Sequence, residues 1–212
     1  MRTKLLRVFA ILSIGAFVFS ACSDDNDSSS GQSETDDNQE EVDETEDNGD
    51  KDENPQEYRI AVASDAHYFD PSLLVEEGKA FNDYVKADRK LICESNDILD
   101  QMFEQIIAQK PQFLMITGDL TKDGEMVSHQ NFAKKLRKVE QEGIKVFVTP
   151  GNHDINNPHA LEYYKAKATP VARVNPSEFK AVYKEFGYDE SEQIEAGPRL
   201  SYVAEPVNGL WL

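Results

Sequence analysis

The stretch Phe113-Leu114-Met115-Ile116-Thr117-Gly118-Asp119 decides the fold of this chain. Its first four residues are all apolar, without the alternation of apolar and polar residues seen in a strand with one face in water. A run of this kind is typical of a parallel strand that helices cover on both faces. Gly118-Asp119 follows at once, so the predicted strand ends on a carboxylate.

Two further predicted strands, one on each side of this stretch, end in the same way. Residues 58–63 form a short apolar run that leads into Asp65-Ala66-His67. Residues 145–149 form another run, which leads into Gly151-Asn152-His153-Asp154. Each of the three strands therefore delivers polar side chains at its carboxyl end.

Two amphipathic helices are predicted between these strands. Over residues 95–109 apolar side chains recur at helical spacing, and they are Ile98, Leu99, Met102, Phe103, Ile106 and Ile107. A second helix ends near Gly143 and has an inward face of Phe132, Ala133, Leu136 and Val139. The order strand, helix, strand, helix, strand predicts an α/β fold with parallel strands and right-handed crossovers.

Parallel strands bring their carboxyl ends to one edge of the sheet, so we expect Asp65, His67, Asp119, Asn152 and His153 to converge there. Carboxylates, amide oxygens and imidazoles are suitable ligands for divalent cations. Residues i and i+2 of an extended strand point the same way, so Asp65 and His67 can bind one ion together. Asp119 can bridge two ions with its two oxygens.

Together these segments resemble the motifs of the calcineurin-like metallophosphoesterases. Asp65-Ala66-His67 matches the D-x-H motif of that family, residues 118–124 match G-D-x-x-x-x-G, and Gly151-Asn152-His153-Asp154 matches G-N-H-D/E. The resemblance covers about residues 58–160. It implies a calcineurin-like phosphoesterase sandwich of β-sheets flanked by helices, of which this chain holds the N-terminal β-α-β-α-β portion.

The resemblance also implies roles for single residues. Asp65 and His67 would bind the first of two divalent ions, Asp119 would bridge both, and Asn152 would bind the second. His153 would not be a ligand but would protonate the leaving group. The ions would be Mn, Fe or Zn, and the partner would be a phosphoester substrate.

Four other polar residues are not expected to bind metal. Asp154 either supports the loop or tunes His153, and Asp123 is another candidate for orienting His153. His129 and His159 are expected to be packed or solvent-facing rather than liganded. No basic cluster indicates nucleic-acid binding.

Two further features lie between the first predicted strand and the first predicted helix. Residues 68–90 carry several large apolar side chains, which would line a substrate cleft or pack beneath a loop. Cys93 is expected to be a small buried residue without a disulfide partner.

The first 22 residues have the composition of an export leader. They carry Arg2, Lys4 and Arg7, no acid, and an apolar run too short to span a bilayer as a helix. The run closes at Cys22 in a sequence that resembles the lipobox of bacterial lipoproteins. We therefore expect a lipoprotein signal peptide over residues 1–22 and lipid attachment at Cys22; the alternative is a plain signal peptide. The location implied is the bacterial cell envelope, lipid-anchored at the outer membrane or cell surface.

Residues 23–56 separate this leader from the folded part. They hold fifteen acidic residues and a single Lys, so they supply most of the net charge of −18. So little apolar surface cannot offset the entropy of ordering, and we expect an acidic disordered linker.

Residues 57–212 are expected to form the metallophosphoesterase domain, truncated at its C-terminus. The family pattern requires more histidines after the G-N-H-D/E motif, and this chain has only His159 there. Two alternatives to an active hydrolase stay open. One is a catalytically incomplete surface lipoprotein or gene fragment with a partial metal-binding site. The weaker one is a nucleotide-binding module, although the chain has no Gly-rich phosphate loop.

Overall fold

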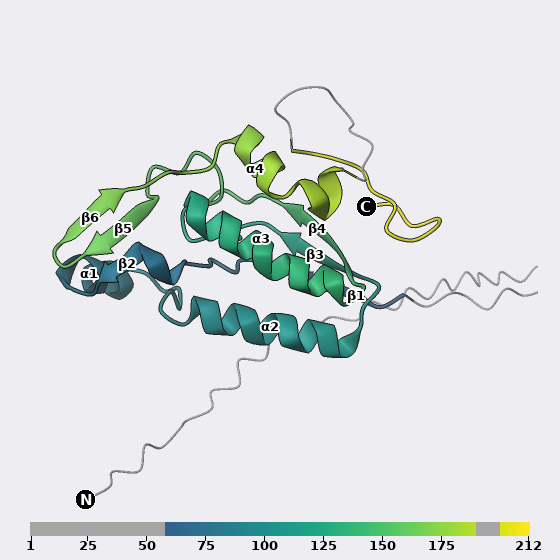
Figure 1. Cartoon of the computed structure of the whole chain (residues 1–212), viewed down its shortest axis with the longest axis horizontal. Helices are drawn as coiled ribbons and strands as arrows, with labels where there is room; N and C mark the ends of the chain where they lie inside the picture. Colours follow the sequence, from purple (N-terminus) through teal and green to yellow (C-terminus); the bar gives the residue numbers. More distant parts are fainter. Residues whose placement is uncertain (1–57, 190–199) are drawn as a thin grey trace, which may run out of the picture. The chain divides into compact units, whose positions relative to one another are not determined.

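The structure is a computed structural model that describes residues 58–189 and 200–212 (Figure 1). The predicted leader, the lipid attachment at Cys22 and the acidic linker therefore lie outside the described residues. The described part has a mixed α/β fold, as predicted. None of its helices has both the length and the apolar character that crossing a membrane requires.

The main sheet consists of the three predicted strands. They are β1 (Ile60–Ala63), β3 (Phe113–Thr117) and β4 (Lys145–Thr149), all parallel and in the order β1-β3-β4. Between them run the two predicted helices, α2 (Ser95–Gln109) and α3 (Met126–Gln141). The predicted parallel sheet with helical crossovers is confirmed.

The prediction that helices cover both faces of this sheet is wrong. Side chains of both α2 and α3 pack on the same face, because two right-handed crossovers that step in the same direction place their helices on one side. Residues 200–212 cover part of the other face, where Ala204, Leu210 and Leu212 contact Phe113 and Phe147.

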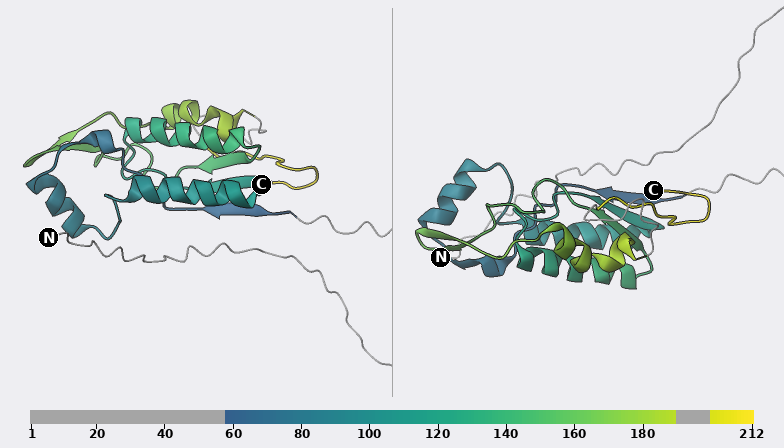
Figure 2. Two further views of the ribbon diagram at one scale, coloured as in Figure 1. Left: turned by 60° about the horizontal axis from the view of Figure 1, so that its bottom comes forward. Right: turned by 90° about the horizontal axis from the view of Figure 1, so that it is seen from above.

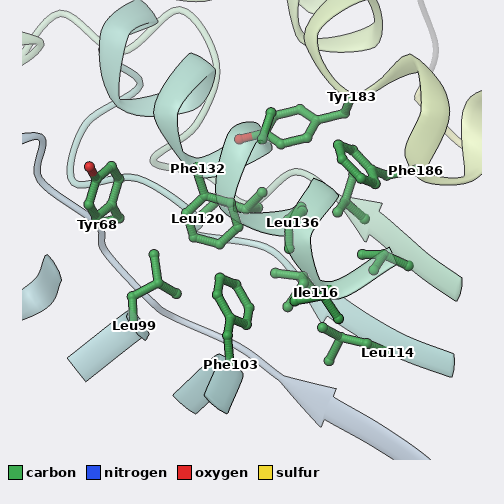
Figure 3. Packing of buried hydrophobic residues seen from close by; sticks show 14 of the residues in the cluster. Tyr68, Leu99, Phe103, Leu114, Ile116, Leu120, Phe132, Leu136, Tyr183 and Phe186 are labelled. Atoms are coloured by element: carbon green, nitrogen blue, oxygen red, sulfur yellow. The ribbon is translucent and has the colours of Figure 1, made fainter. Parts of the chain in front are cut away.

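The main core lies between the sheet and these helices, and Figure 3 shows its packing. Leu114 and Ile116 of β3 share this core with Leu99 of α2 and Leu136 of α3. Helix α4 (Pro176–Val182) and the helical turn Lys184–Tyr188 extend it on the side of α3. This core fixes the three strands whose ends carry the candidate site.

A second, smaller sheet was not predicted. It contains β2 (Leu74–Glu76), β5 (Leu161–Tyr164) and β6 (Lys167–Pro170), with β2 parallel to β5 and β5 antiparallel to β6. The helical turn Pro71–Leu73 precedes β2, and helix α1 (Lys79–Ala87) follows it. Figures 1 and 2 place this sheet beyond the carboxyl ends of the main strands.

The hydrophobic cluster beside this small sheet consists of Phe69, Leu73, Phe81, Ile92 and Tyr163. Residues 68–90 thus contribute mainly to packing, although a pocket of about 310 Å³ remains beside Phe69 and Phe81. The expectation that Cys93 is buried is wrong, because this free cysteine is exposed. Cys93 lies in the turn before α2, where its neighbour Ile92 is the buried residue.

Candidate metal centre

The first two site loops are joined by backbone hydrogen bonds directly beyond the sheet. The N–H of Asp65 donates to the carbonyl of Gly118 at 3.1 Å, and that of His67 donates to the carbonyl of Asp119 at 2.9 Å. Both loops leave the extended conformation, since φ is 56° at Asp65, 41° at His67 and 48° at Asp119. Positive φ values at residues other than glycine are strained and cluster at functional sites.

The argument that Asp65 and His67 share one face of an extended strand is therefore wrong, because β1 ends at Ala63. The two side chains nevertheless meet. The Nε2 atom of His67 lies 3.8 Å from Oδ1 of Asp65 and 3.8 Å from Oδ2 of Asp119. The left-handed turns of the loop, rather than the pleat of a strand, bring these atoms together.

These separations suit a shared cation. They are too long for hydrogen bonds, whereas ligands that each lie about 2.1 Å from one ion are roughly 3–4 Å apart. Ligand atoms of His67, Asp119 and His153 all lie within 4.8 Å of one another. The buried Nδ1 atom of His67 has no hydrogen-bond partner among the described residues. Burial and the nearby charge of Lys90 lower the pKa of His67, although Asp119 acts in the opposite direction. The lowered pKa favours the neutral imidazole, which is the form that binds metals.

No contact within the described residues links the side chain of Asn152 to the other candidate ligands. Asn152 is exposed on the loop after β4, and its side chain makes no hydrogen bond within the described residues. Its role as a ligand of a second ion stays a prediction.

His153 faces the same site from the loop after β4. Its ring lies 4.9 Å from the ring of His67, nearly perpendicular to it. Its Nδ1 atom is 2.8 Å from the carbonyl oxygen of Lys122 and 2.9 Å from Oδ1 of Asp123. Both neighbours are acceptors, so Nδ1 carries a proton and Nε2 is the atom left for a reactant. Asp123, which the sequence offered only as a candidate for orienting His153, is thus in contact with its ring.

The side chain of Asp154 supports the site loops and does not contact the ring of His153. Its fully buried carboxylate accepts hydrogen bonds from the backbone N–H groups of Leu120, Thr121 and Gly151, and from the hydroxyl of Thr121, at 2.8–3.1 Å. Burial raises the pKa of Asp154, and these hydrogen bonds oppose that shift. The side chain thereby joins the loop after β3 to the loop after β4.

His129 continues this network into the core. It is fully buried, with Nε2 3.0 Å from the carbonyl oxygen of Asp154 and Nδ1 2.9 Å from the hydroxyl of Tyr183. His159 is exposed. The prediction that these two histidines are packed or solvent-facing is confirmed.

Sequence reasoning missed Lys122, which is fully buried between Asp123 and Glu125. Burial disfavours its charged form, but the two carboxylates outweigh that effect and the pKa of Lys122 is raised. The acidic residues one and three positions after Lys122 were the available signal, yet a lysine in a loop is ordinarily exposed.

The ligand set and its spacing fit a divalent cation, and the comparison with family models agrees. The model for the calcineurin-like phosphoesterases matches residues 58–203, which is more than half of the chain. The chain therefore belongs to the calcineurin-like phosphoesterase family. Comparison with curated proteins finds none that matches it.

Proposed function

We propose that this protein hydrolyses phosphoric mono- or diesters with the help of two divalent ions. The observation that carries the proposal is the convergence of His67, Asp119 and His153 within 4.8 Å at the carboxyl edge of the main sheet. Asp65, His67 and Asp119 would hold the first ion, and Asp119 and Asn152 the second. When bound, such ions polarise phosphoryl oxygens and lower the pKa of water that attacks phosphorus.

The residues of the chain supply the remaining chemistry. His153 keeps Nδ1–H pointed at Asp123 and directs Nε2 toward the site, so Nε2 is the atom that transfers a proton to the departing alkoxide. Asp154 keeps the loops that carry Asp119 and His153 at a fixed separation. Each of these tasks depends on positions set by the three strand ends.

Turnover by the full chain tests this proposal. Mn²⁺-dependent release of nitrophenol from p-nitrophenyl phosphate or its bis-ester is expected, and Asp119→Asn serves as the inactive control. The absence of turnover with Mn²⁺, Zn²⁺ and Fe²⁺ would contradict it.

A second candidate function is a catalytically incomplete surface lipoprotein that retains a partial metal site. It is favoured by one observation: among the described residues, His67 and His153 are the only histidines at the site, since His129 is buried elsewhere and His159 is exposed. Metal binding in calorimetry without turnover would support this candidate over the hydrolase.

We also propose that the protein is anchored by a lipid on Cys22 at the outer membrane or surface of a bacterial cell, with residues 23–56 as an acidic tether. The cationic and apolar leader and its lipobox-like end support this location. Cys22→Ser is expected to release or mislocalise the protein. A variant that stays in the membrane pellet after fractionation would contradict the anchor.

A further inference from the structure

We propose that Lys122 is a positioning residue, which fixes the Asp123–His153 pair by fastening it to the aromatic rings beside the small sheet. The inference rests on the proposed function for the role of His153 as proton donor. The contacts that support it involve Lys122 and its neighbours alone.

The ammonium group of Lys122 has a complete set of partners. Its side chain is fully buried, and its Nζ atom lies 2.5 Å from Oδ2 of Asp123, 3.3 Å from Oε1 of Glu125 and 3.4 Å from the carbonyl oxygen of His159. Three acceptors match the three N–H donors of an ammonium group. These three contacts therefore fix the position of Nζ on the side that faces the acceptors.

Aromatic rings enclose the other side of the same atom. Nζ lies 4.6 Å from the ring centre of Tyr84, 5.8 Å from that of Tyr163 and 5.9 Å from that of Phe69. Tyr84 belongs to α1 and Tyr163 to β5, while Phe69 follows the first site loop. Cations within about 6 Å of ring centres are attracted to them, so the small sheet holds Lys122 in place.

The two oxygens of Asp123 have separate partners. Oδ2 contacts Lys122, whereas Oδ1 accepts hydrogen bonds from Nδ1 of His153 at 2.9 Å and from Nδ2 of Asn157 at 3.1 Å. If Lys122 lost its charge, the buried carboxylate would lose its ammonium partner, keep only the contacts of Oδ1, and would turn toward water. The charge of Lys122 thus sets the orientation of Asp123, and Asp123 sets the ring of His153.

Packing alone does not explain a lysine here. A buried ion pair costs desolvation, and an apolar side chain of similar volume usually packs at least as favourably. The ammonium group is instead placed where it restrains a carboxylate in contact with the candidate proton donor. This argument predicts that Lys122→Met changes the hydrogen bond of His153 while the core stays packed.

Nuclear magnetic resonance of the full chain labelled with ¹⁵N-histidine tests this prediction. The chain has only four histidines, so the ring signals of His153 are assigned by substitution. In Lys122→Met, water exchange of the His153 Nδ1 proton is expected to become at least about tenfold faster than in the wild type. Metal affinity is expected to be unchanged, which shows that the ligand loops keep their structure.

Lys135→Met is the matched control. Lys135 also pairs with a carboxylate, that of Asp100 at 2.5 Å, and lies 5.7 Å from the ring centre of Tyr68. It makes no contact with Asp123 or His153 among the described residues, so exchange at His153 is expected to stay at the wild-type rate.

A second pair of variants decides the question if Lys122→Met does not fold. Tyr84→Leu removes the ring over Nζ, whereas Tyr84→Phe keeps the ring and loses only the hydrogen bond from the hydroxyl to Asp88. Faster exchange in the first and unchanged exchange in the second are expected. Wild-type exchange in a folded Lys122→Met, or in Tyr84→Leu, would overturn the inference. No substrate is used, so a chain without turnover would contradict the proposed function and leave this result valid.

Discussion

The Oδ1 atom of Asp119 accepts a hydrogen bond from the backbone N–H of His153 at 2.9 Å. The same carboxylate presents Oδ2 to Nε2 of His67 at 3.8 Å. One oxygen therefore holds the loop after β4, while the other faces the candidate cation site. Asp119 is at once a candidate ligand and the link between two loops.

Asp119→Asn separates these two tasks. The amide oxygen of Asn still accepts from His153, but the negative charge that attracts the ions is gone. We expect Mn²⁺ affinity to fall roughly 10- to 100-fold or more, turnover to be lost, and the thermal unfolding midpoint to change little. Calorimetric titration and circular dichroism measure these quantities. Asp97→Asn, in the exposed first turn of α2, is the control, and equal metal affinity in both variants would refute the assignment.

His153→Ala is expected to act differently, because His153 is assigned to proton transfer rather than to metal binding. Metal affinity should persist, while turnover of alkyl phosphoesters falls about 10²- to 10⁴-fold. Nitrophenyl esters should lose much less, since nitrophenolate leaves without a proton. Rates for the two ester types, measured side by side, check this. Equal losses for both would argue against a general acid at this position.

Part of the fold was predictable from the sequence. The apolar stripe of residues 95–109 matches the bounds of α2, because a long segment with helical periodicity carries a strong signal. The runs at 113–117 and 145–149 match β3 and β4, because each is a short apolar run bounded by polar or turn residues. The small sheet was missed. Its strands β2, β5 and β6 have three or four residues each, and β6 is exposed throughout, so no pattern marks them.

For the candidate site, the motifs indicated which residues converge but not how they do so. The left-handed backbone at Asp65 and His67 arises from hydrogen bonds to the loop after β3, a contact between distant segments. The enclosure of Lys122 likewise needs rings from α1 and β5. Tertiary contacts of this kind leave no local signal in a single sequence.

Gly151→Ala tests how closely the loops approach. A Cβ atom at residue 151 would overlap both the side chain and the backbone nitrogen of Asp119. We expect a loss of about 2 kcal/mol in the free energy of unfolding and a weaker metal site, because Asp119 must shift. Denaturant unfolding and metal titration measure the two effects.

Gly143→Ala is the control for that substitution. Its Cβ would meet no atom within 4 Å, although φ is 84° there. Strain at this position should cost about 1 kcal/mol and leave metal affinity unchanged. If Gly151→Ala also kept wild-type metal affinity, the close approach of Gly151 and Asp119 would have no bearing on the site.

The buried ring of His129 is expected to make the stability of the protein depend on pH. Burial lowers its pKa from 6.5 to about 4, and its neutral ring is held by the carbonyl of Asp154 and the hydroxyl of Tyr183. The Asp154 carboxylate lies 3.9 Å from Nε2, but burial raises the pKa of Asp154 and so weakens its hold on an imidazolium ion. Between pH 6.5 and 4 the unfolded chain binds the proton that the folded protein excludes. The contribution of His129 to the free energy of unfolding is therefore complete above pH 6.5. It falls by about 3 kcal/mol as the pH drops to 4.

The comparison of His129→Gln with the wild type isolates this contribution, since other titrating groups act on both proteins. The difference in the free energy of unfolding between the two should be largest near pH 7 and should shrink by about 3 kcal/mol at pH 4. Urea unfolding at several pH values measures it. His159→Gln, which changes an exposed histidine, should follow the wild type at every pH. A constant difference between His129→Gln and wild type across this range would show that His129 is not held neutral by the core.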